Sequence, residues 1–136
     1  MRDLLNKLKL LVALNGATIS SSTTTAGAII DTAGFDSLLF EIFSGARTDG
    51  TYTPLVEDGD DSGLSDAAAV DDKYLIGTEA GAVITGANKR AKVGYIGPKR
   101  YVRLSIVSTV VTTGAYLGAT AILGNPATAP QSTQVN

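Results

Sequence analysis

The sequence contains no cysteine, no histidine and no tryptophan among its 136 residues. Without cysteine or histidine the chain cannot form a disulfide scaffold or a Cys/His zinc site, and it lacks the side chains that most often activate a nucleophile. The absence of tryptophan weakens a carbohydrate-binding interpretation, because sugar rings usually stack on aromatic side chains. We therefore expect no enzyme activity and no cofactor.

Charged residues are few and unevenly placed. The 11 basic and 13 acidic residues give a net charge of −2, so the chain has no overall positive field with which to attract nucleic acid. Residues 104–136 carry no charge, but they are rich in serine, threonine and glycine, which is typical of strands and turns rather than of a membrane helix. We expect neither nucleic acid nor a membrane as a partner.

Apolar residues alternate with other residues in several short segments. Within 35–43, Leu38, Phe40 and Ile42 would share one face of a strand, and the same pattern recurs within 101–107. Six to eight such strands, joined by glycine-rich turns and without repeated helices, predict an all-β fold. The expected architecture is an antiparallel β-sandwich that resembles a jelly roll.

The turn signals divide these strands. Asp49-Gly50 is the strongest type of two-residue hairpin signal, and Gly97-Pro98 separates two later strands. The glycine-rich segment 111–124 predicts a last hairpin. Pro54 cannot donate a backbone hydrogen bond, so we expect its strand to lie at a sheet edge or to be interrupted there.

We expect a single β-sandwich domain over residues 1–136. Residues 1–24 are assigned to an extended N-terminal arm and connector, 25–124 to the β core, and 125–136 to an extended C-terminal tail. Residues 1–14 fit both helical spacing and strand alternation. The tail is polar, and its two prolines resist both helix and sheet.

Seven of the thirteen acidic residues fall within the acidic segment 57–72. Four residues there follow the spacing of the first part of an EF-hand calcium loop: Asp58, Asp60, Ser62 and Asp66. The twelfth position of such a loop requires a bidentate glutamate but is occupied by Ala69. We expect a solvated loop without a metal ion, and a calcium site is the weaker alternative.

The segment VGYIGPKRYVRLSIV, residues 93–107, groups basic and aromatic side chains around a turn. Arginine and tyrosine are enriched at protein interfaces because both combine buried area with hydrogen bonding. We predict that five residues line an interface: Lys99, Arg100, Tyr101, Arg103 and Tyr95. A solvated strand is the alternative, whereas strand alternation disfavours nucleic-acid binding because it places some of these side chains on opposite faces.

Three segments carry a resemblance to known proteins: DGTYTP at 49–54, VGYIGPKRYVR at 93–103 and LGNPATAP at 123–130. Together with the sequence around them, from about Ala26 to Pro130, they resemble a family of small virion proteins of tailed phages and prophages. This family includes capsid decoration (cement) proteins. None of the three segments is catalytic, so they indicate a scaffold rather than a chemistry.

The resemblance implies a structural virion protein that binds the major capsid protein on the outside of the head, usually as a homodimer or homotrimer. Such a subunit would be made in the host cytoplasm and located on the outer capsid surface, where it stabilises the shell by bridging capsomers. Two other functions stay open. Related β-sandwiches serve as head-tail connector, head-completion or tail proteins, and a jelly roll can also be a carbohydrate-binding or adhesion module.

Overall fold

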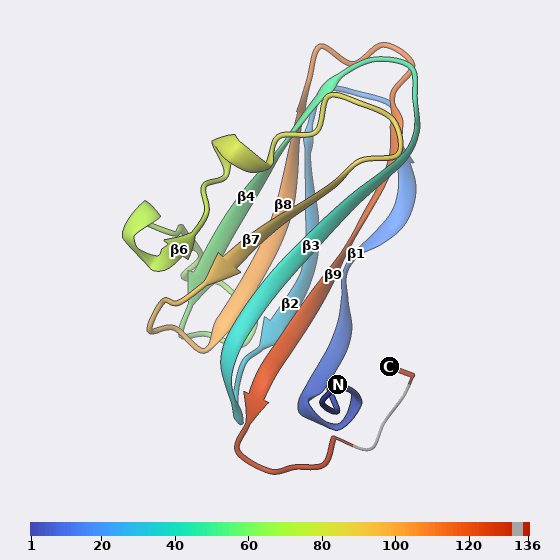
Figure 1. Ribbon diagram of the computed structural model, residues 1–136. Helices are drawn as coiled ribbons and strands as arrows, with labels where there is room; N and C mark the ends of the chain where they lie inside the picture. Colours follow the sequence, from blue (N-terminus) through green and yellow to red (C-terminus); the bar gives the residue numbers. More distant parts are fainter. Residues whose placement is uncertain (132–134) are drawn as a thin grey trace.

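The computed structural model describes residues 1–131 and 135–136 (Figure 1). Among these residues the chain forms nine β-strands and three short 3₁₀ helices. The strands are β1 (Leu8–Ile19), β2 (Thr24–Asp31), β3 (Phe35–Arg47), β4 (Thr51–Gly59), β5 (Ala68–Ala69), β6 (Leu75–Ile76), β7 (Arg90–Tyr95), β8 (Tyr101–Thr109) and β9 (Ala115–Pro126). The helices are η1 (Leu5–Lys7), η2 (Asp72–Tyr74) and η3 (Ala80–Ala82). No helix in this part of the chain has the length and apolar character needed to cross a membrane.

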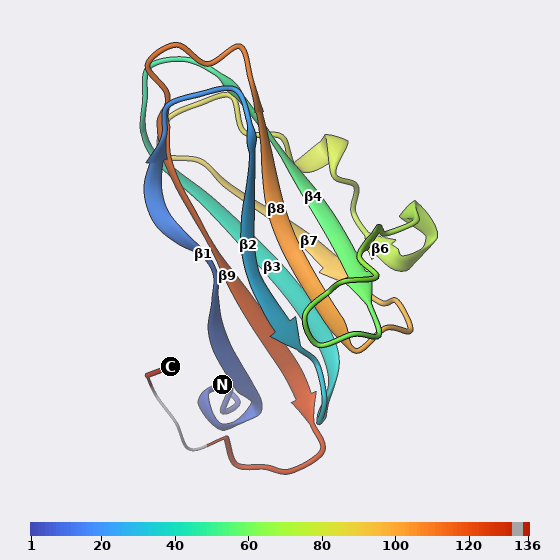
Figure 2. The same ribbon diagram turned by 180° about the vertical axis from the view of Figure 1, so that it is seen from behind.

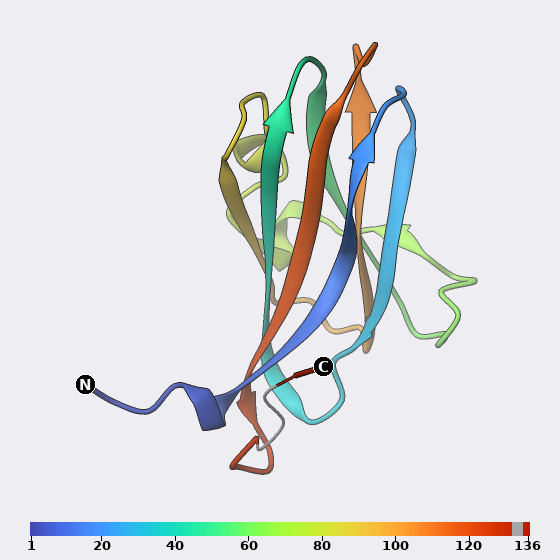
Figure 3. The same cartoon turned by 90° about the vertical axis from the view of Figure 1, so that its right-hand side faces the viewer.

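The strands form two sheets that pack against each other. Sheet A has the order β1-β9-β3-β7-β6, and sheet B has the order β2-β8-β4-β5. Figure 3 shows β1, β9, β3 and β7 side by side, and Figure 2 shows β2, β8 and β4. Every strand pair is antiparallel. The predicted all-β antiparallel sandwich is confirmed.

The chain passes from one sheet to the other at most of its connections. Only the β4–β5 and β6–β7 connections join neighbouring strands of one sheet. The pairs β1–β9, β2–β8 and β3–β7 enclose one another along the chain, so that β1, β2 and β3 form one arm of a long antiparallel ribbon and β7, β8 and β9 form the other. Because this ribbon wraps around the core, β9 also lies beside β3, and β8 also lies beside β4. This is the topology of a jelly roll, as the sequence predicted.

The hydrophobic core lies between the inner faces of the two sheets. The predicted alternation is confirmed, because six alternate residues of β3 and β8 are at most 5% exposed: Leu38, Phe40, Ile42, Val102, Leu104 and Ile106. Tyr52 of β4 is fully buried, and its hydroxyl donates to the Asp49 carbonyl at 3.0 Å. Among the described residues, every buried side-chain nitrogen or oxygen has a hydrogen-bond partner.

Strand β1 corrects the predicted N-terminal arm. Residues Leu8–Ile19 pair with β9, and Ala13, Leu14 and Ile19 are buried in the core. Burial of this apolar surface favours the strand over an extended arm or a helix. The predicted connector is reduced to a short turn before β2, and only the residues before Leu8 extend from the sandwich (Figure 3).

Both predicted hairpins are instead crossings between the sheets. Asp49-Gly50 does form a tight turn, with Gly50 at a φ of 93°, but β3 belongs to sheet A and β4 to sheet B. In the segment 111–124 the chain turns once and then continues as the single strand β9, which leaves β8 for the other sheet. A turn sequence specifies the local path of the backbone, whereas long-range packing selects the partner strand.

Pro54 lies where β4 pairs only with β8, as expected for an edge position. On the side away from β8, the Tyr52 N–H donates to the Ile84 carbonyl and the Val56 N–H donates to Glu79 Oε1. Pro54 lies midway between these two residues in the strand, so its nitrogen also faces away from β8. The missing N–H therefore removes no hydrogen bond between β4 and β8.

The predicted C-terminal tail begins within β9, which continues through Pro126. Beyond the strand the chain returns to the N-terminal segment, where the Gln131 N–H donates to the Asn6 carbonyl at 2.8 Å. Figure 2 shows both termini at the same end of the sandwich. The part of the predicted tail at 132–134 lies outside the described residues.

Truncation of Leu104 should destabilise the sandwich strongly, because this side chain is fully buried. We expect Leu104→Ala to lower the free energy of unfolding by about 2–4 kcal/mol through the cavity that it leaves. Val107→Ala, on the half-exposed outer side of the same strand, should cost less than about 1.5 kcal/mol. Chemical denaturation followed by circular dichroism measures both values, and equal losses would contradict the assignment of Leu104 to the core.

Candidate interaction surface

The segment 93–107 lies at one end of the sandwich, where the chain passes from β7 to β8. Lys99 and Arg100 lie in this connection and are half-buried and exposed, respectively. Tyr101 and Arg103 lie on β8 and are half-buried on its outer side, on the face opposite to the buried Val102. Four of the five predicted interface residues are therefore accessible, at one end of the molecule and on the adjoining outer face of sheet B.

Tyr95 is a core residue and corrects the fifth prediction. Its side chain points inward from β7 and is 5% exposed. Its hydroxyl donates to Asp58 Oδ2 at 2.7 Å, which connects sheet A to sheet B, and it accepts the Lys99 N–H at 3.1 Å. Burial and the hydrogen bond to Asp58 raise the pKa of Tyr95 well above its ordinary value. Tyr95 therefore positions the β7–β8 connection from inside and cannot contact a partner directly.

The basic residues of the β7–β8 connection pair with carboxylates of the same subunit. Arg100 donates two hydrogen bonds of 2.8 Å to the carboxylate of Asp31, at the end of β2. Lys99 forms an ion pair with Asp60, just beyond β4. The hydrogen bonds from Arg100 lower the pKa of Asp31 to about 2. The basic cluster of the sequence is thus neutralised locally, in part by the acidic segment.

Arg103 and Glu57 form the least exposed ion pair of this surface. The two residues are cross-strand neighbours on β8 and β4, and Arg103 donates to Glu57 Oε2 at 2.8 and 3.1 Å. Their side chains are 23% and 20% exposed, and the Ser105 hydroxyl donates to the same oxygen at 3.3 Å. This pair contributes to the structure of sheet B as well as to its outer surface.

The acidic segment holds its own loop together. The Asp66 carboxylate accepts the backbone N–H groups of Asp60 and Asp61, which lowers the pKa of Asp66. Asp58 and Asp60 are engaged by Tyr95 and Lys99, so the residues of the weaker calcium alternative have separate partners. No group of three or more potential metal-ligating residues gathers among the residues that the structure describes.

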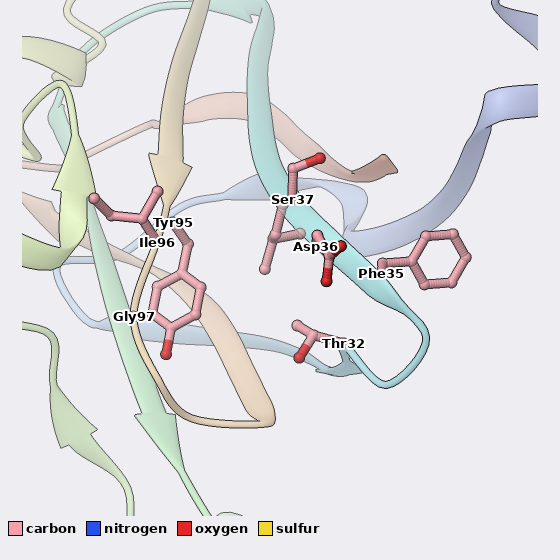
Figure 4. A pocket seen from close by; sticks show the side chains of 8 residues that line it. Thr32, Phe35, Asp36, Ser37, Tyr95, Ile96 and Gly97 are labelled. Atoms are coloured by element: carbon pink, nitrogen blue, oxygen red, sulfur yellow. The ribbon is translucent and has the colours of Figure 1, made fainter. Parts of the chain in front are cut away.

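A shallow hollow of about 150 Å³ lies beside this surface, between the β2–β3 turn and the end of β7. Figure 4 shows Thr32, Asp36 and the ring of Tyr95 around it, with the ring of Phe35 turned away. The Thr32 hydroxyl already donates to the Arg100 carbonyl at 2.8 Å. The hollow is smaller than the roughly 300–1,000 Å³ that small-molecule sites usually occupy.

The surface presents alternating positive and negative side chains rather than a positive stripe. Such a pattern suits recognition of a protein with complementary charges and does not track a nucleic-acid backbone. Asp31 and Glu57 were not predicted as partners of the arginines. They lie 69 and 46 positions away in the chain, and no sequence signal connects them.

No protein-family model and no curated protein sequence matches the chain. Among solved structures, the chain is similar to the crystal structure of the SPBc2 prophage-derived protein YomS, with a TM-score of 0.53 and 15% sequence identity. The match covers 87% of this chain and 93% of that chain. At this identity the similarity shows a shared fold, and this fold therefore occurs in a phage-derived protein.

The Asp31–Arg100 pair predicts a pH dependence in the acid range. Because the pKa of Asp31 is lowered from 3.8 to about 2 on folding, the contribution of the pair is complete above about pH 4 and is lost as the pH falls toward 2. The melting temperature of Asp31→Asn should therefore fall less than that of the wild type between these pH values. At pH 7 the variant should be only slightly less stable, because the pair is half exposed. If the melting temperatures of Asp31→Asn and the wild type fall by the same amount between about pH 4 and pH 2, the pair does not form in solution.

Proposed function

We propose that the chain is a structural protein of a tailed-phage virion that binds the outer surface of the capsid and stabilises it by bridging capsomers. The observation that carries this proposal is the fold shared with a prophage-derived protein over 87% of the chain. The three segments that resemble virion proteins, at 49–54, 93–103 and 123–130, support it independently. The proposed role is structural rather than enzymatic.

The rigidity of the sandwich supports this role. Strands β1, β3 and β9 contain 12 or 13 residues each and pack on one hydrophobic core. A preorganised subunit loses little conformational freedom when it binds. Copies arranged on a symmetric shell can then stabilise it together, because many modest contacts act by avidity.

We assign the capsid contact to the charged end of the sandwich, with four residues retained from the sequence prediction: Lys99, Arg100, Tyr101 and Arg103. The intramolecular ion pairs hold these long side chains in defined positions before binding, which reduces the entropy that binding would otherwise cost. Arg100 also lies over the ring of Tyr101, 5.1 Å from its centroid. Because each positive charge has a carboxylate neighbour, the surface would select its partner by charge pattern rather than by net charge.

Removal of an arginine should weaken capsid attachment. We expect Arg100→Ala and Arg103→Ala each to cost about 1–3 kcal/mol of binding free energy, measured by co-sedimentation with capsids that lack the protein. Arg100→Ala should leave subunit melting nearly unchanged, whereas Arg103→Ala should lower it because Glu57 is left half-buried without its main partner. Lys89→Ala, which removes a charge at the opposite end of β7, is the matched control. Wild-type occupancy by both arginine variants across a salt titration would refute the assigned surface.

The copy number in purified virions tests the role itself. A decoration protein should be present in on the order of hundreds of copies, following the symmetry of the shell, and capsids without it should burst at lower temperature. About a dozen copies or fewer would instead indicate a connector, head-completion or tail protein. Absence from virions, together with binding on a glycan array, would favour the adhesion module.

A further inference from the structure

An apolar row crosses all five strands on the outer face of sheet A. The strand register places Leu10 beside Ile122, Ile122 beside Leu39, Leu39 beside Gly94, and Gly94 beside Ile76. The end residues Leu10 and Ile76 are 49% and 63% exposed. Scattered apolar residues on a surface are ordinary, but a continuous row of this width indicates an interaction site.

Gly94 makes this row concave. A hollow of about 630 Å³ opens above it, and Ile76, Leu39 and Ile122 contribute to its walls. A Cβ atom at position 94 would lie only 3.3 Å from the Cβ of Ile76, so the glycine keeps the floor of the hollow open. The row therefore contains a cavity beside the projecting side chain of Leu39.

The next two rows of the same face carry charge. Glu41 of β3 lies beside Lys92 of β7, and Phe43 lies beside Arg90. Arg90 forms an ion pair with Glu41 and lies 5.7 Å from the centroid of the Phe43 ring. Lys92 is exposed and forms no ion pair with any residue in the described part of the chain.

We infer that the outer face of sheet A binds a second copy of the chain, about a two-fold axis that runs parallel to the strands between β3 and β7. Under this axis, each row of one copy faces the same row of the other copy. Strand β3 of one copy faces β7 of the other, and β9 of one copy faces β6 of the other. Leu39 of one copy then enters the hollow above Gly94 of the other, and Ile122 packs on Ile76 of the other. Each contact occurs twice, as an isologous interface requires.

The charged rows match under the same axis. Glu41 of each copy meets Lys92 of the other, and Phe43 meets Arg90. The ammonium group of Lys92 thereby gains a carboxylate neighbour, and Arg90 gains a second aromatic ring. A single symmetry operation thus satisfies the apolar row and the charged rows together, which favours a second copy over an unrelated partner.

The charged end and the outer face of sheet B stay free, so this inference is independent of the proposed capsid contact.

Sedimentation equilibrium of the full chain in the absence of capsids tests the dimer. The wild type should sediment at twice the mass of the chain. Leu39→Lys should raise the dimer dissociation constant at least about tenfold, because an ammonium group would be placed in the apolar hollow. Leu55→Lys is the matched control, because Leu55 is equally half-buried but lies on the outer side of β4 in sheet B.

Charge reversal provides a second test that does not depend on the apolar row. Glu41→Lys and Lys92→Glu should each weaken the dimer, since like charges would meet twice, and the double variant should recover most of the wild-type affinity. Circular dichroism establishes that each variant folds, and if Leu39→Lys does not fold, the charge-reversal series decides. A monomeric wild type at about 0.1 mM, a trimer, equal dissociation of Leu39→Lys and Leu55→Lys, or no recovery in the double variant would overturn the inference.

Discussion

The two sheets share one hydrophobic core, and this constraint determines where every other feature of the molecule lies. Each long strand must turn one face inward, so the chain wraps around the core and crosses from sheet to sheet. This wrapping makes β8 a neighbour of both β2 and β4. Asp31 and Glu57 are brought to the arginines of β8 and its preceding connection for this reason, although they lie far away in sequence.

The sequence predicted local geometry well and strand partners poorly. Alternation at Leu38, Phe40 and Ile42 identified the inner face of β3, because a strand with one buried side repeats every two residues. Asp49-Gly50 identified a turn but not the sheet that follows it, because turn propensity contains no information on distant strands. The apolar residues from Leu8 fitted two periods, and only the pairing with β9 selects the strand.

The interaction surface was predicted in part for the same reason. Lys99 and Arg100 are polar residues beside a Gly-Pro turn, and such residues are usually accessible. Tyr95 follows Val93 by two positions and shares the inner face of β7 with it, so the burial of Tyr95 could have been predicted from strand periodicity. Alternation with Leu38 and Phe40 places Leu39 on the outer face, but the apolar row of sheet A could not be predicted, because only the strand register brings Ile122 and Gly94 beside Leu39.

The paired charges give a physical reason to connect the two proposals. Each arginine at the charged end already binds a carboxylate, so a new contact with the capsid replaces or shares an existing interaction and contributes only a modest free energy, about 1–3 kcal/mol. A dimer formed through sheet A presents two charged ends on one rigid body. When the first end is bound, the second is held at a high effective concentration near the shell, and the combined affinity exceeds that of either end. Weak individual contacts are then sufficient for stable attachment, and they need no single dominant anchor residue.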